Sequence, residues 1–171
     1  MDTVIPTVTQ LIGGLIGKIW LSVSFPIYVL YILLNNNWKV LHSISDSWYV
    51  LKQKEQHEEI LFTIFTYLLG IGTLLQYYHS PLFFIAGMGF FWVGTQTQFR
   101  STVSVKGTIH YIGAVLGISL SLVGLLLQGV WLPLLIMIIG VGIMKWKKWN
   151  NFIWWSEILA FLTTIGGLWI L

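Results

Sequence analysis

The side chains best suited to chemistry in this chain are a histidine and a glutamate inside long apolar runs. Glu157 lies about five residues into the run at 152–171, and His110 is the second residue of the run at 109–127. A carboxylate at a depth of roughly 8 Å in a membrane is costly unless it is paired, hydrated or protonated. Histidine titrates near neutral pH, so the two could form a protonatable pair in a cavity or a proton path. The simpler alternative is a pair that only fixes the register of two helices.

More polar residues fall on the same side of the expected topology. The segment at 42–49 holds three serines and Asp46, whose oxygens could cap the helix that follows. Alternatively, the segment folds back over the helix ends, and its polar groups join His110 and Glu157. Arg100 could join the same cluster. Gln96 and Gln98 could line the same vestibule, with plain interfacial solvation as the alternative. The candidate binding site therefore comprises His110, Glu157, Asp46, Ser45, Gln96 and Arg100.

Lys18 stands apart, nearer the opposite end of the first apolar run. Its long apolar stem would let the ammonium reach the membrane interface. The alternative is a buried counter-ion or an anion site.

No metal or nucleophile motif accompanies these residues. The sequence lacks cysteine, an HExxH motif, a histidine pair at i,i+4, a phosphate-binding loop and a Gly-x-Ser-x-Gly elbow. We therefore expect no metal, no cofactor and no catalytic residue. An enzyme that acts on lipid through the same Ser, Asp and His side chains is the alternative.

Six apolar runs must position these groups. Only 9% of the 171 residues are charged and 56% are apolar, with a mean hydropathy of +0.80. A soluble domain carries about a quarter charged residues, so this is the composition of a membrane protein. A helix needs roughly 20 apolar residues to cross the hydrocarbon. The runs at about 11–34, 60–77, 81–97, 109–127, 130–144 and 152–171 predict one all-α transmembrane bundle domain over residues 1–171.

The cations indicate the orientation of these spans. Eight of the nine Lys and Arg residues lie in three polar segments that alternate with uncharged hairpins. If every run crosses once, all eight lie on one side, which the positive-inside rule assigns to the cytoplasm. We therefore expect both termini on the outer side, in the inner (plasma) membrane of a bacterium. Cations beside membrane spans favour anionic lipid headgroups, and not nucleic acid, as partners.

Small residues recur at helical spacing in three of the runs. His110, Ala114, Gly117, Ser121 and Gly124 share one face, as do Glu157, Ala160, Thr164 and Gly167; Gly13 and Gly17 form a similar pair in the first run. Small residues let membrane helices approach closely, so the fourth and sixth spans could lie side by side. The same stripes could instead join copies of the chain into a homo-oligomer.

Four short strings carry a resemblance to known proteins. They are SISD at 43–46, LFTIF at 61–65, HYIGA at 110–114 and WWSE at 154–157. Their order resembles that in uncharacterised small six-span membrane proteins of bacteria and their phages. It is also loosely similar to the DRAM-like six-helix membrane family, in which a short Ile-Ser loop motif precedes the second span. The resemblance covers most of the chain and implies six spans, but no established activity.

The sequence therefore favours a membrane bundle that binds or transports a lipid or a small polar solute at a vestibule near the cytoplasmic face. A membrane-embedded enzyme that modifies lipid and a non-catalytic assembly module are the two alternatives.

Overall fold

The computed structural model describes residues 6–53, 59–95 and 105–171 of the chain. In these ranges the chain is helical and contains no strand, which confirms the prediction of an all-α fold. The helices are α1 (Val8–Asn35), α2 (Ser47–Lys52), α3 (Ile60–Leu74), α4 (Pro81–Thr95), α5 (Val105–Leu127), α6 (Leu132–Trp146) and α7 (Phe152–Ile170).

One long helix lies at each of the six apolar runs, and α2 is a short additional helix between the first two. By length and composition, α1, residues 108–127 of α5, and α7 could each cross a membrane. The apolar helices α3, α4 and α6 have 15 residues each and are shorter. Pro26 lies inside α1 and does not end it. The helix begins with a capping box, in which Thr7 and Gln10 hydrogen-bond to each other.

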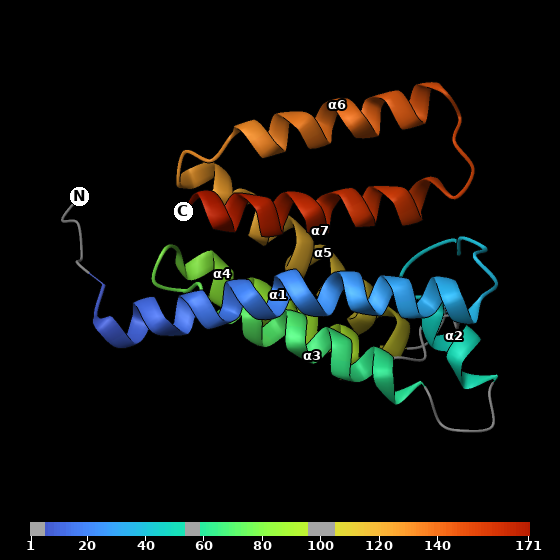
Figure 1. Ribbon diagram of the computed structural model, residues 1–171, viewed down its shortest axis with the longest axis horizontal. Helices are drawn as coiled ribbons and strands as arrows, with labels where there is room; N and C mark the ends of the chain where they lie inside the picture. The colour runs from blue at the N-terminus through green and yellow to red at the C-terminus, as the bar shows by residue number, and fades with distance from the viewer. Residues whose placement is uncertain (1–5, 54–58, 96–104) are drawn as a thin grey trace.

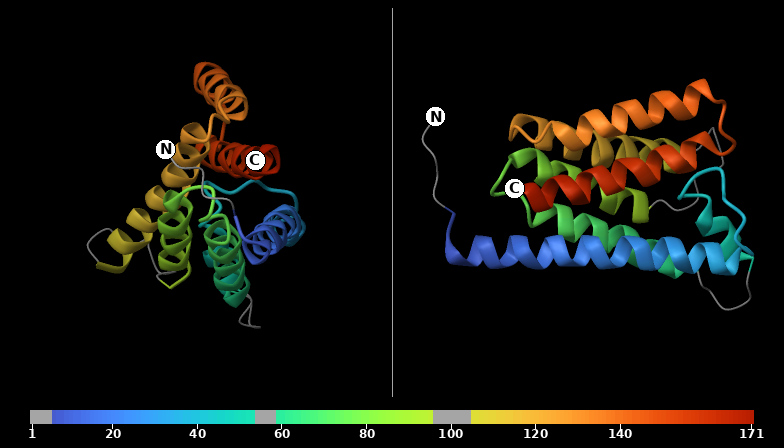
Figure 2. Two further views of the ribbon diagram at one scale, coloured as in Figure 1. Left: turned by 90° about the vertical axis from the view of Figure 1, so that its left-hand side faces the viewer. Right: turned by 45° about the horizontal axis from the view of Figure 1, so that its top comes forward.

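The long helices alternate in direction, and all of them except α5 run roughly along one axis, whereas α5 crosses the bundle obliquely (Figures 1 and 2). α1 begins and α7 ends at the same end of the bundle, which we call the terminal end. α2 and the turn between α6 and α7 lie at the opposite end, which we call the basic end because Lys39, Lys52 and Lys145 lie there. Figure 2 shows α6 on the outside of the bundle, packed along α7.

Glycines bring neighbouring helices into backbone contact. A Cβ atom added at Gly87 of α4 would lie 2.7 Å from the carbonyl oxygen of Gly70 in α3. One added at Gly89 would lie 2.7 Å from the carbonyl oxygen of Gly113 in α5. Such close approach supplies dispersion contacts between the helices.

The small-residue stripes of α5 and α7 are used differently from one another. The two helices are neighbours, and Gly167 of α7 makes room for Leu125 of α5. The two glycines of the α5 stripe, however, make room for aromatic rings of α4: Gly117 for Phe90 and Gly124 for Phe83. Each of the three stripe glycines is therefore matched with a large side chain of a neighbouring helix in the same chain.

Candidate functional site

The polar segment after α1 folds back against the bundle. Asp46 takes the position before α2, but its side chain makes no capping hydrogen bond to that helix. Its Oδ2 instead accepts a hydrogen bond from Ser43 Oγ at 3.2 Å, and Ser43 Oγ accepts one from the Asp46 N–H at 3.2 Å. Of the two sequence interpretations, the structure thus has the folded-back segment, which we call loop 42–47.

Loop 42–47 brings together four of the predicted site residues. The N–H of Ile44 donates to Glu157 Oε2 at 2.6 Å. On the next residue, Ser45 Oγ lies 3.1 Å from His110 Nε2. Glu157 and His110 are therefore held by adjacent residues of one loop, with Asp46 buried beside them. The predicted partners Gln96 and Arg100 lie outside the described residues.

The same loop satisfies a free backbone donor at the start of α7. The first N–H groups of a helix have no partner within the helix. The carbonyl oxygen of His42 accepts from the N–H of Trp154 at 3.0 Å. Just before the loop, the carbonyl oxygen of Val40 accepts from the side-chain Nδ2 of Asn151, the residue before α7, at 3.3 Å. The sequence did not predict these contacts, because every residue has a backbone carbonyl whatever its type.

Tyr28 of α1 is a second residue that the sequence did not single out. Its hydroxyl lies 2.6 Å from Ser47 Oγ, which in turn donates to the carbonyl oxygen of Ile44 at 2.6 Å. Both side chains are buried, so the bond is shielded from water. It fixes the first residue of α2 to α1.

The polar cluster encloses little space. A cavity of about 30 Å³ is lined by Ser45, Glu157, Thr66 and several apolar side chains. That volume suits about one water molecule, and no lipid or larger solute. Among the residues that the structure describes, no group of three or more His, Asp or Glu side chains could hold a metal ion.

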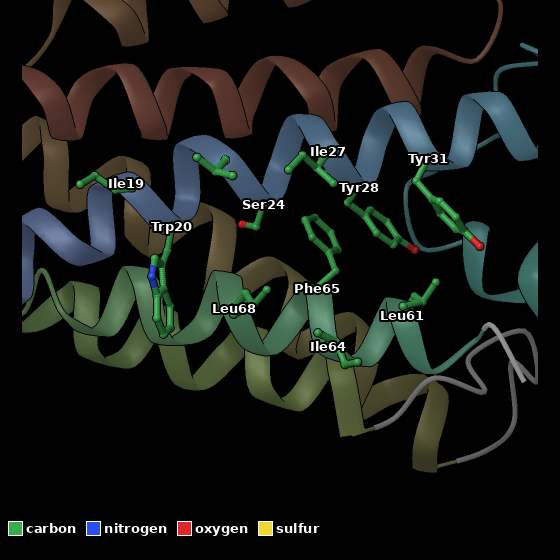
Figure 3. Close-up of a pocket in the computed structure, with 11 residues that line it drawn as sticks. Ile19, Trp20, Ser24, Ile27, Tyr28, Tyr31, Leu61, Ile64, Phe65 and Leu68 are labelled. Carbon is green, nitrogen blue, oxygen red and sulfur yellow. The ribbon is translucent and has the colours of Figure 1, made fainter.

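A much larger space lies between α1 and α3. It is a groove of about 600 Å³, and Figure 3 shows its side chains along the two helices. The lining is Ile19, Trp20, Val23, Ser24, Ile27, Tyr28 and Tyr31 from α1, and Leu61, Ile64, Phe65 and Leu68 from α3. This lining is apolar except for the three hydroxyl groups and the indole N–H, and among the described residues it includes no charged side chain.

The groove occupies only the basic half of the α1–α3 interface. On α3 it covers residues 61–68, the first half of the helix. On α1 it runs from Ile19 to Tyr31, a rise of about 18 Å at 1.5 Å per residue. Figure 1 shows α3 diverging from α1 toward the end where α2 lies. The stacked rings of Tyr28 and Phe65, whose centroids are 4.0 Å apart, hold the helices separate there.

Lys18 lies at the other half of the bundle, near the hairpin between α3 and α4. Burial lowers the pKa of His79 in that hairpin below its usual range, and the positive charge of Lys18 lowers it further. Lys18 is thus well separated along α1 from the polar cluster of Ser45, Asp46, His110 and Glu157 at the basic end.

Comparisons with protein families, with curated proteins and with solved structures found no match.

Proposed function

We propose that this protein is an integral membrane bundle of six spans that holds the acyl chain of a lipid between α1 and α3. Three helices are long and apolar enough to cross a membrane. The shorter α3, α4 and α6 run alongside them, and a locally thinned bilayer would accommodate helices of this length. In this proposal the basic end faces the cytoplasm and both termini lie on the outer side, in the inner membrane of a bacterium.

The groove is the observation that carries the lipid-binding proposal. Its volume of about 600 Å³ falls in the usual range of ligand sites, and its lining is apolar. Ile27 is 62% exposed and Val23 49% exposed, so the groove opens onto the surface that lipid would cover. Its length of about 18 Å is close to one leaflet, which is half of a hydrocarbon layer about 30 Å thick. One chain from one leaflet therefore fits along it.

The groove also favours a lipid over a small polar solute. Beside Ser45 and Glu157 the cavity measures only about 30 Å³, which is too small for a lipid or a larger solute. The polar cluster therefore has a structural role in this proposal. It holds loop 42–47 and the beginning of α2 in place beside the groove.

Filling the groove tests the proposal. We expect Ile27→Trp to place an indole where the chain would lie, whereas Ile138→Trp adds the same ring to an α6 position that is 63% exposed. Native mass spectrometry of protein purified in mild detergent should find one retained phospholipid in the wild type and in Ile138→Trp. Ile27→Trp should have lost it. Equal retention in both variants, or no retained lipid in any, would contradict the proposal.

The orientation has its own test. The chain contains no cysteine, so single cysteines can be introduced without altering the background. A membrane-impermeant maleimide should label Tyr77→Cys in intact cells, and Gln53→Cys only after permeabilisation. The reverse pattern would mean that the basic end faces outward.

A second candidate function rests on the 3.1 Å distance between Ser45 Oγ and His110 Nε2. A serine within hydrogen-bond reach of a histidine is the arrangement of an activated nucleophile and its base. The flanking N–H groups, however, already donate, that of Ile44 to Glu157 and that of Asp46 to Ser43, which leaves them unable to stabilise an oxyanion. A fluorophosphonate probe that labels the wild type but not Ser45→Ala or His110→Ala would establish a hydrolase; no labelling would exclude this use of Ser45.

A further inference from the structure

The groove ends beside α2, which carries a fixed cation. Tyr28 lines the groove and its hydroxyl contacts Ser47, the first residue of α2, so this helix stands at the basic end of the groove (Figures 1 and 3). Lys52 is the last residue of α2, and its Nζ lies 4.6 Å from the ring centroid of Trp48. Trp48 is buried, so this cation–π contact holds the ammonium near one place.

A second cation follows the end of α1. The carbonyl oxygen of Lys39 accepts from Asn36 Nδ2 at 2.6 Å, which closes the turn after the helix. Asn37 and Trp38 adopt left-handed backbone conformations in this turn, with φ of 52° and 61°. Trp38 is 63% exposed and Lys39 is exposed beside it. An exposed tryptophan next to a lysine at a helix end is typical of the headgroup region of a membrane.

The acidic side chains nearby do not cancel these two cations. Asp46 is buried in loop 42–47 beside Ser43 and does not face the groove. Glu59 precedes α3 at the same end and is partly exposed. Among the described residues at this end of the groove, two lysines therefore stand against one glutamate, which favours an anionic group.

We infer that the lipid held in the groove is an anionic phospholipid of the cytoplasmic leaflet, with its phosphate at Lys39 and Lys52. This inference rests on the proposed function, since it concerns the headgroup of the lipid whose chain lies between α1 and α3. The groove places a chain in the basic half of the bundle, and a chain there ends in a headgroup at the level of these lysines. Zwitterionic lipid would fit the groove equally well but would gain less from the two charges.

The test compares two headgroups on the same chains. Protein in nanodiscs is titrated with spin-labelled phosphatidylglycerol or phosphatidylcholine, and the motionally restricted lipid displaced by Ile27→Trp is taken as the groove fraction. We expect the wild type to prefer phosphatidylglycerol, and Lys39→Gln with Lys52→Gln to lose about fivefold in preference for each lysine. The matched control, Lys145→Gln with Lys147→Gln, removes two exposed charges from the same end beside α6 and should keep the preference.

Each other outcome overturns the inference. If the wild type shows no preference, or if both double variants lose the preference equally, Lys39 and Lys52 do not select the headgroup of the lipid in the groove. If the groove binds phosphatidylcholine and phosphatidylglycerol alike, the inference fails while the proposed function stands. If Ile27→Trp displaces neither lipid, the proposed function fails and this inference fails with it.

Discussion

The two halves of the α1–α3 interface are built from different residues and have opposite properties. In the terminal half, a Cβ added at Gly17 would lie 2.7 Å from the carbonyl oxygen of Gly72, so the helices touch backbone to backbone. Gln76 Nε2 also donates to the carbonyl oxygen of Gly14 at 2.9 Å there. In the basic half, the stacked rings of Tyr28 and Phe65 separate the same two helices.

One pair of helices can therefore be in close backbone contact along one half of its interface, which we call the sealed half, and leave a groove along the other, which we call the open half. In lipid, close packing and hydrogen bonds hold helices together, because burying apolar surface gives no advantage over lipid contact. Glycines supply the close packing in the terminal half. The bulky side chains of the basic half cannot approach as closely, and the space that remains is apolar. In our account, a lipid chain fills that space and restores the dispersion contacts that an empty groove would lose.

The largest expected effect comes from breaking the sealed half. Gly17→Ala should lower the free energy of unfolding by about 3 kcal/mol, because the new methyl group meets a backbone carbonyl that cannot move independently. Gly13→Ala is the matched control, since a Cβ there would lie 3.7 Å from Leu75 in ordinary contact. Unfolding in sodium dodecyl sulfate measures both. Equal stability of the two variants would contradict the backbone contact between α1 and α3.

A somewhat smaller effect should follow from releasing loop 42–47 at the open half. Glu157→Ala leaves the N–H of Ile44 without its acceptor, which should cost about 2 kcal/mol. Glu157→Gln keeps an acceptor oxygen and should lose less. Hydrogen exchange at the Ile44 amide should accelerate strongly in the alanine variant. Unchanged protection there would show that Glu157 does not hold the loop.

Removing one hydroxyl at the boundary between groove and loop should have a modest effect. Tyr28→Phe keeps the ring that stacks on Phe65 and deletes the bond to Ser47. We expect a loss of about 1 kcal/mol, because Ser47 retains its bond to the carbonyl oxygen of Ile44. The groove should still retain lipid in native mass spectrometry. Loss of lipid together with little change in stability would instead assign the hydroxyl to the ligand.

The smallest effect should be a pH dependence at the sealed end. Because burial and Lys18 lower the pKa of His79, the unfolded chain binds a proton there more readily than the folded protein. Neutral His79 therefore contributes its full stabilisation of the folded protein above pH 6.5, about the pKa of histidine in the unfolded chain. This stabilisation is lost as the pH falls from there toward the lower pKa of His79 in the folded protein. His79→Gln should flatten the decrease in unfolding midpoint between pH 7 and pH 5. If the unfolding midpoint of His79→Gln decreases with pH as steeply as that of the wild type, His79 is not the cause of the decrease.

The sequence predicted the helices better than it predicted the spaces between them. Apolar runs bounded by polar segments placed the six long helices, because a continuous apolar run has few other stable forms in a membrane. The loop at 43–46 and its partners His110 and Glu157 were also identified, since polar groups in apolar surroundings require an explanation. Of these, His110 and Glu157 are held by adjacent residues of the loop.

The groove could not be read from the sequence. It depends on how far α1 and α3 diverge, and that follows from which rings meet across the interface. Ile19, Ile27 and Leu68 are indistinguishable by type from other apolar residues of the same runs. The exposed lysines of the basic end were predicted to face anionic lipid, but only the position of α2 connects Lys52 with the groove.

A photoreactive phospholipid can locate the acyl chain on the protein. Protein in nanodiscs that contain a phospholipid with a diazirine in one acyl chain is irradiated, and the labelled residues are identified by peptide mass spectrometry. We predict that labelling concentrates on the basic half of the α1–α3 interface, at positions such as Val23, Ile27 and Ile64, and that Ile27→Trp abolishes this concentration. Labelling that is no stronger there than at Ile12 in the terminal half or at Ile138 on α6 would contradict the account.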